Sequence, residues 1–157
     1  MIKIDNLSKE ESDRYSRLLS TIFNESFNNY PENAQKYFLE YWRKKNLEEH
    51  ISKEDMILLV AKDGEKLVGY LIGKIHPSGN SSIRWLGVLS NYKGQGIGRN
   101  LVKRYEKWAA GKGAKKIIVS TANFNNERFY LNLGFTELSK RAKNDWGMSK
   151  LVFVKRI

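Results

Sequence analysis

A glycine-rich segment between an apolar stretch and an amphipathic stretch is the feature that most constrains the fold. Residues 83–88 are mostly apolar, and the apolar residues that follow Ile97 recur on one helical face. Gly94, Gly96 and Gly98 occupy alternate positions between them, where glycine lets the backbone turn without steric cost. The order of strand, glycine loop and helix predicts that backbone N–H groups converge at the positive end of the helix, which favours a phosphate site.

Basic side chains strengthen this prediction. Lys93, Arg99 and Lys103 surround the loop and suit a pyrophosphate with a further phosphate. The alternative is a turn that merely begins a helix. Two known phosphate loops do not match. The spacing is G-x-G-x-G rather than the dinucleotide G-x-G-x-x-G, and no glycine precedes a Lys-Ser or Lys-Thr pair in the frame of a nucleotide P-loop.

Apolar periodicity over the rest of the chain predicts an α/β fold. Three helices are expected outside the glycine segment, over residues 9–25, 31–42 and 126–132. The strands expected are 56–61, 67–73, 83–88, 116–121, 135–140 and 148–155. The first two strands form a hairpin around an Asp-Gly turn. Strands 83–88 and 116–121 are expected to run parallel, joined by the helix through a right-handed crossover. No linker or repeat interrupts the chain, so residues 1–157 are expected to form one domain around a mixed sheet.

The charge is unevenly distributed along the chain. Residues 1–56 hold 9 Lys/Arg against 11 Asp/Glu, whereas residues 57–157 hold 19 against 6, and the whole chain carries a net charge of +11. A basic field of this kind attracts polyanions. A nucleic acid and a multiply phosphorylated small molecule are both consistent with it.

Cysteine is absent from the sequence. Disulfides, thiolate zinc sites and an acyl group held on an enzyme thiol are therefore excluded, and no metal site is expected. No apolar run approaches the ~20 residues that span a bilayer, and the N-terminus lacks the apolar core of a signal peptide. These features predict a cytoplasmic protein without a membrane partner.

Two motifs in the second half of the chain resemble the GNAT superfamily of acetyl-CoA-dependent N-acetyltransferases. The family's central motif is a strand, a short turn and [RQ]-x-x-G-x-[GA] opening a helix, and residues 86–98 read LGVLSNYKGQGIG. A second family segment has an Asn-containing turn followed by Tyr-x-x-x-Gly-Phe, and residues 123–135 read NFNNERFYLNLGF. Lys93 departs from the pattern because it stands where the family usually has Arg or Gln; it keeps the charge without the planar fork.

The resemblance implies a fold and an activity. The expected fold is a GNAT-like mixed, mostly antiparallel sheet with a central parallel strand pair, flanked by helices. The expected reaction is transfer of an acetyl group from acetyl-CoA to a primary amine. Because the chain has no cysteine to hold the acetyl group and no apparent Ser-His-Asp pattern, we expect direct transfer within a ternary complex. The acceptor amine is a small molecule, a polyamine or a protein amine, and the enzyme is a monomer or a homodimer.

The resemblance also implies roles for individual residues. The hydroxyl of Tyr130 is expected to face the CoA sulfur and to donate a proton or hydrogen bond to the leaving thiolate; the alternative is a helix tyrosine that only packs against its neighbours. A bulge in the strand before the loop is expected near Gly87; the alternative is a strand glycine that allows close packing. Asn123 and Asn126 compete as the side chain that binds the CoA arm, and either is equally suited to cap the short helix. The expected CoA-binding residues are Leu86, Gly87, Val88, Lys93, Gly94, Gln95, Gly96, Ile97, Gly98, Arg99, Asn123 and Asn126.

A general base has no motif behind it. Residues 81–90 contain no acidic residue, although many family members place a Glu on this strand. The remaining candidates are His76, Glu25, Glu40 and Asp145. Only His76 has an ordinary pKa suited to the task, and no base is assigned.

The acceptor is expected between the first two helices and the hairpin, where the net charge turns slightly acidic. Tyr30, Tyr37, Tyr41 and Trp42 are candidates to line an acceptor groove, although an aromatic stripe at helical spacing also suits a core. The alternative function is a basic nucleic-acid-binding module without catalysis. The lysines are scattered and no RRM or helix-turn-helix pattern is present, so the enzyme is favoured.

Overall fold

A seven-stranded sheet in the order β1-β2-β3-β4-β5-β7-β6 forms the centre of the protein in the computed structural model, which describes residues 1–157 except the side chain of Lys44. All neighbouring strands are antiparallel except β4 and β5. The sheet is therefore mixed and mostly antiparallel, with one central parallel pair, as the sequence predicts. Its strands are β1 Ile2–Asn6, β2 Met56–Asp63, β3 Lys66–Ile75, β4 Ser81–Val88, β5 Lys116–Thr121, β6 Thr136–Lys143 and β7 Ser149–Arg156.

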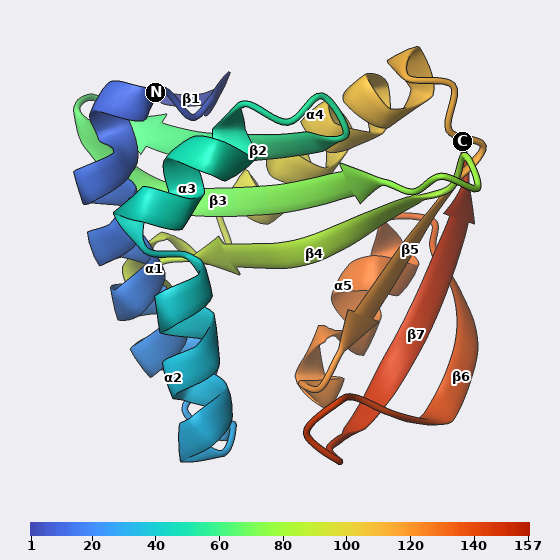
Figure 1. The fold of residues 1–157 in the computed structure, drawn as a ribbon. Coiled ribbons are helices and arrows are strands. Elements are labelled where there is room, and N and C mark those ends of the chain that lie inside the picture. Colours follow the sequence, from blue (N-terminus) through green and yellow to red (C-terminus); the bar gives the residue numbers. More distant parts are fainter.

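Helices cover both faces of this sheet. α1 to α3 lie on one face, and α4 and α5 lie on the other (Figure 1). The helices are α1 Ser12–Ser26, α2 Glu32–Tyr41, α3 Lys44–Ile51, α4 Ile97–Gly111 and α5 Glu127–Asn132. Short 3-10 turns occupy η1 Lys9–Glu11, η2 Ser90–Tyr92 and η3 Phe124–Asn126. Among the described residues, no helix combines the length and the apolar character required to cross a bilayer.

The parallel pair separates along its length. β4 and β5 pair only from Ser81 to Ile83, opposite Ile117 to Val119. Beyond that point β4 stays paired with β3 and β5 with β7. The two halves of the sheet therefore diverge (Figure 1), and the β5-facing edge of β4 beyond Ile83 has no strand partner.

The bulge in β4 lies three residues before the position expected from the resemblance. Arg84 is the residue without a partner, because Ile83 pairs with Gly73 and Trp85 with Ile72. Gly87 pairs regularly with Tyr70, so the expectation of a bulge there is wrong. A Cβ at Gly87 would lie 2.7 Å from Ile22 Cγ2 and 2.8 Å from Tyr70 Cε1. Glycine is thus required at this position so that α1 and β3 can pack closely.

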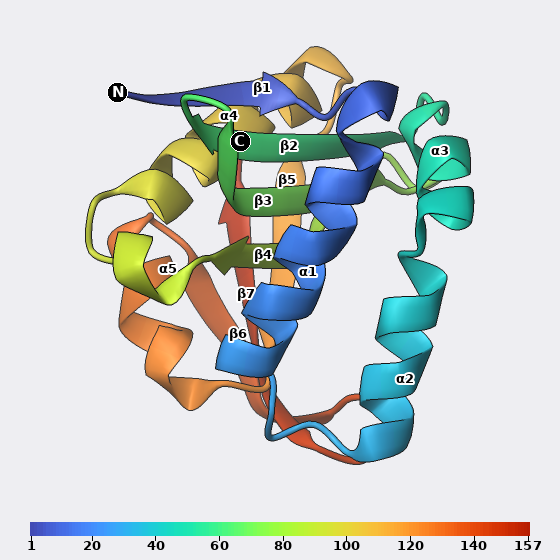
Figure 2. The same cartoon turned by 90° about the vertical axis from the view of Figure 1, so that its left-hand side faces the viewer.

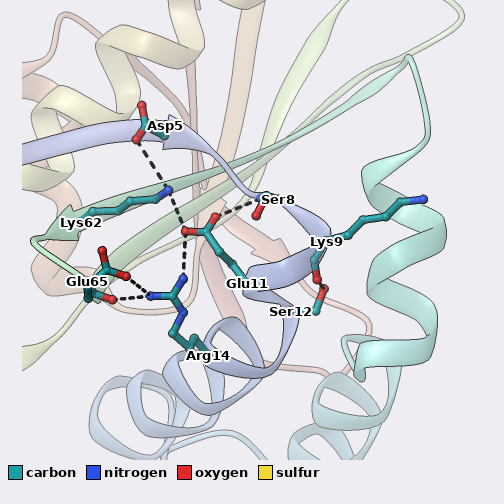
Figure 3. A network of polar contacts seen from close by, with 8 residues as sticks. All are labelled: Asp5, Ser8, Lys9, Glu11, Ser12, Arg14, Lys62 and Glu65. Atoms are coloured by element: carbon teal, nitrogen blue, oxygen red, sulfur yellow. Dashed lines mark hydrogen bonds and ion pairs between the residues drawn. The ribbon is translucent and has the colours of Figure 1, made fainter.

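A network of charged groups fixes the start of α1 to the first strands (Figure 3). The carboxylate of Glu11 accepts a hydrogen bond from the backbone N–H of Ser8 at 3.0 Å, which is one of the two hydrogen bonds of a capping box. Lys62 on β2 contacts the same carboxylate at 2.7 Å, and Arg14 joins it to Glu65 in the hairpin turn. Burial raises the pKa of the Glu11 carboxyl, but the hydrogen bonds from Lys62 and Ser8 more than offset this effect and lower the pKa below its usual value.

The structure contains most of the expected elements and two that were not expected, β1 and α3. Seen from the side of α1 (Figure 2), β1 forms an edge of the sheet and α3 follows α2; the sequence patterns predict neither element. The second predicted helix, over 31–42, matches α2, and the strand predicted over 116–121 matches β5. The hairpin turns at Gly64, whose φ is 56°.

Candidate active site

The glycine loop has the conformation that its sequence predicts. Gly94 and Gly96 both have φ of 78°, a region in which a side chain is strained. A Cβ on either residue would meet no atom within 4 Å, so the backbone here borders open space. Gly96 is the N-cap of α4 without a side-chain cap hydrogen bond, and the first N–H groups of the helix are therefore left for a ligand.

A cavity of about 420 Å³ opens at this loop, beside the edge of β4. Lys93 lies at its rim, where its Nζ donates to Ser26 Oγ at the end of α1 (3.1 Å). Gln95 and Lys103 do not contribute to the lining, and the Gln95 amide donates to the Asn91 carbonyl at 3.5 Å. The expected site residues that line this cavity are Leu86, Gly87, Val88, Lys93, Gly94, Gly96, Ile97, Gly98, Arg99, Asn123, Asn126 and Tyr130.

The start of α5 is held against the start of α4. A Cβ at Gly98 would lie 3.2 Å from Phe129 Cζ, so the third glycine allows these two helices to approach closely. Phe129 in turn packs edge-on against Tyr130, with ring centroids 5.0 Å apart. The glycine loop and the expected catalytic tyrosine are thereby joined in one packed unit.

Tyr130 is 5% exposed, and its ring is enclosed by Phe129, Phe135 and Phe153. Burial raises the pKa of its hydroxyl well above the usual range. The hydroxyl keeps its proton at neutral pH and can donate a hydrogen bond, whereas the raised pKa disfavours complete transfer of that proton. Tyr130 packs against these rings and also lines the cavity, so a packing role and the expected role as a donor to the CoA sulfur are compatible.

The two asparagines differ in their surroundings. The side-chain carbonyl of Asn123 accepts a hydrogen bond from the backbone N–H of Asn125 at 3.0 Å and caps the turn before α5. The Asn126 amide donates to Thr121 Oγ1 at 3.1 Å. Both side chains line the cavity, but only Asn126 also lines the neighbouring one.

A second cavity of about 610 Å³ lies in the opening between β4 and β5. It is bounded by α2, by β4 and β5, and by the turn between β6 and β7 rather than by the hairpin. Tyr30 and Tyr37 line it as expected, whereas Tyr41 is outside its lining and Trp42 is buried against His50. Trp85 and Trp146 are further aromatic residues of its lining, and no sequence motif points to them. The residues shared by the two cavities are Phe27, Leu86, Asn126 and Tyr130.

Of the four candidate bases, only Asp145 lines this second cavity. Glu25 accepts hydrogen bonds from the backbone N–H and the hydroxyl of Ser90, both at 3.0 Å. Glu40 pairs with Arg43 at 2.8 Å. His76 contacts Ser82 Oγ at 2.8 Å, and burial, with the nearby charges of Arg84 and Lys74, lowers its pKa.

The site is thus two cavities that meet at a divergent strand pair, one bordered by an anion-binding loop and the other by aromatic rings. Within the described residues, no group of three or more His, Cys, Asp or Glu side chains is placed to hold a metal. This combination defines an acyltransferase-like site on an α/β scaffold. The chain belongs to the acetyltransferase (GNAT) family, whose model matches residues 17–135, and the expectation of an acyltransferase is confirmed.

Solved structures with similar folds include three named acetyltransferases. The PaiA N-acetyltransferase of Thermoplasma acidophilum, in complex with coenzyme A, has 21% identity and a TM-score of 0.85, over 100% of this chain and 99% of the other. The ribosomal-protein-S18-alanine N-acetyltransferase of Escherichia coli has 16% identity and a TM-score of 0.73, over 100% and 94%. An aminoglycoside 6′-N-acetyltransferase complexed with coenzyme A has 18% identity and a TM-score of 0.74, over 98% and 96%. A comparison of the sequence with curated proteins gives no match.

Proposed function

We propose that this protein transfers an acetyl group from acetyl-CoA to a primary amine. The observation that carries the proposal is the meeting of the two cavities at Phe27, Leu86, Asn126 and Tyr130. A donor in the first cavity and an acceptor in the second would react at this junction. The coenzyme-A complexes among the similar structures support the choice of donor.

The residues around the first cavity fit acetyl-CoA. The backbone of Gly94 and Gly96 borders open space, the first N–H groups of α4 have no side-chain cap, and Lys93 and Arg99 add positive charge beside them. These groups suit the pyrophosphate. The unpaired edge of β4 beyond Ile83 offers N–H and C=O groups to the amide-containing pantetheine arm, as a strand edge does to an extended peptide.

The reaction forms an amide bond and breaks the thioester. The neutral amine nitrogen attacks the acetyl carbon, the C–S bond breaks, and the sulfur leaves as a thiolate that must gain a proton while the nitrogen loses one. Tyr130, at the junction of the two cavities, is the proposed donor of a hydrogen bond or a proton to the sulfur. The chain lacks cysteine, which excludes an acetyl-cysteine intermediate, and we propose that the transfer is direct, within a ternary complex.

Initial rates with varied acetyl-CoA and varied amine test this proposal. We expect release of free thiol to match formation of the acetylated amine in mass spectra, and double-reciprocal plots that intersect. Parallel lines, or an acetylated enzyme that passes its acetyl group to the amine, would contradict direct transfer. Failure to form any acetylated amine from a panel of small amines and peptides would contradict the function itself.

A further inference from the structure

Apart from Tyr130 at the junction, aromatic rings from four separate parts of the chain wall the second cavity. They come from the end of α1 and the segment after it, from α2, from β4 and from the turn between β6 and β7. These residues are Phe27, Tyr30, Tyr37, Phe38, Trp85 and Trp146. Trp85 is central, since its ring centroid lies 4.4 Å from that of Phe38 and 5.0 Å from that of Phe27, and both pairs pack edge-on. The cavity therefore presents a preformed aromatic wall.

Trp146 extends this wall from the turn between β6 and β7. Its ring centroid lies 5.7 Å from that of Tyr37 and 6.2 Å from that of Phe38, both on α2. The side-chain carbonyl of Asn144 accepts from the backbone N–H of Trp146 and from that of Met148, both at 3.0 Å. The turn that carries Trp146 is thereby fixed, so the ring is positioned before a ligand arrives.

The charges in the lining disfavour a strongly cationic ligand. Among the described residues of the wall, Asp145 is the only carboxylate, and it is accompanied by Arg84 and Lys150. An amine with several ammonium groups would lack a partner for all but one of them and would be repelled by the two cations. A ligand with one amine and an apolar body buries that body against the aromatic rings, and its amine needs no carboxylate besides Asp145.

We propose that the acceptor is a monoamine with an aromatic body, such as an arylalkylamine, and that Trp85 and Trp146 select it. This inference rests on the proposed function and specifies its acceptor. The aromatic body lies between Trp85 and Trp146, while the amine points toward the junction at Tyr130. Polyamines are poor acceptors by the same reasoning.

The comparison of 2-phenylethylamine with spermidine tests the inference, at saturating acetyl-CoA and with free-thiol detection. We expect kcat/KM for 2-phenylethylamine to exceed that for spermidine by about tenfold or more, the factor expected from a pair of aromatic contacts. Calorimetric titration with acetyl-CoA is carried out in parallel. If acetyl-CoA binds but spermidine is used equally well or better, or 2-phenylethylamine is not acetylated, the inference is wrong and the proposed donor site survives. If acetyl-CoA does not bind, both fail.

Two pairs of variants locate the selectivity. Trp146→Ala is expected to lower kcat/KM for 2-phenylethylamine about tenfold, chiefly through KM, and to change the value for spermidine less than about threefold. Trp108→Ala makes the same change on α4, outside both cavities, and should leave the ratio of the two kcat/KM values unaltered.

Tyr37, 52% exposed at the cavity rim, provides the second pair of variants. Tyr37→Glu should shift the preference toward spermidine about fivefold and Tyr37→Gln should not, since only the former adds a carboxylate. An unchanged ratio in both Trp146→Ala and Tyr37→Glu would overturn the assignment.

Discussion

The ring of Tyr130 lies against that of Phe153, with centroids 5.3 Å apart and planes inclined by 31°. Tyr130 is on α5 and Phe153 on β7, whose neighbour β5 diverges from β4 at the site. The contact fixes the tyrosine at the junction of the two cavities. Its position thus depends on the same strand divergence that opens the site.

Replacement of Tyr130 by phenylalanine keeps this contact and removes only the hydroxyl. If the hydroxyl protonates the leaving thiolate, Tyr130→Phe should lower kcat by ~10² to 10⁴, with the affinity for acetyl-CoA within about threefold of the wild type. Steady-state kinetics and calorimetry on this one variant measure both quantities. A kcat within about threefold of the wild type, together with a lower Tm, would assign the residue to packing alone.

Gly87 and Gly111 should respond in opposite directions to alanine. A Cβ at Gly87 would be 2.7 Å from Ile22, whereas one at Gly111 would meet no atom within 4 Å. Gly87→Ala should therefore lower the free energy of unfolding by about 1–3 kcal/mol. Gly111→Ala, at the last residue of α4, should raise it by up to about 1 kcal/mol. Urea denaturation monitored by circular dichroism measures the difference, and equal stability of the two variants would refute the packing role of Gly87.

The elements that the sequence predicts are those with a strong local pattern. The elements that it does not predict have a weak pattern of their own and depend on contacts with distant parts of the chain. The glycine loop, α4 and β5 carry their information in glycine spacing and apolar periodicity. β1 is a half-exposed edge strand whose register is set by β2, more than fifty residues later in the chain, so its own residues carry a weak signal. α3 buries little besides Leu47 and His50, and its apolar stripe is correspondingly short.

The same distinction applies to the site. The expected CoA-binding residues come mostly from a local strand, loop and helix, and all of them except Gln95 line the first cavity. The second cavity is assembled from α2, β4 and the β6–β7 turn. Trp85 and Trp146 are far apart in sequence and share no spacing, so only the tertiary arrangement identifies them as one wall. The bulge at Arg84 likewise depends on the register with β3.

The pKa of Glu11 leads to a prediction about acid stability. Because its pKa in the folded protein lies below the usual value, this carboxylate stabilises the fold above pH ~4.3. That contribution is lost as the pH falls through the folded-state pKa. Glu11→Gln should therefore destabilise the protein by about 1–3 kcal/mol at pH 7, and the difference from the wild type should shrink below pH ~4.

Urea denaturation at pH 7, 4 and 3 measures this dependence. Glu54→Gln, a substitution of an exposed carboxylate, serves as the control and should have a small effect at each pH. A stability difference for Glu11→Gln that stays constant from pH 7 to pH 3 would show that the Lys62 contact does not depend on the charge of Glu11.

The binding of acetyl-CoA to Gly96→Asp tests the central claim most directly. The substitution places a negative charge where the pyrophosphate is proposed to bind, and Gly79→Asp provides a matched control. Gly79 has φ of 81°, and a Cβ there also meets no atom within 4 Å, so both variants carry the same strain and the same charge. Isothermal titration calorimetry on the folded proteins should show an affinity about a hundredfold or more lower in Gly96→Asp and close to the wild type in Gly79→Asp. Equal affinity of Gly96→Asp and the wild type would contradict the assignment of the glycine loop as the acetyl-CoA site.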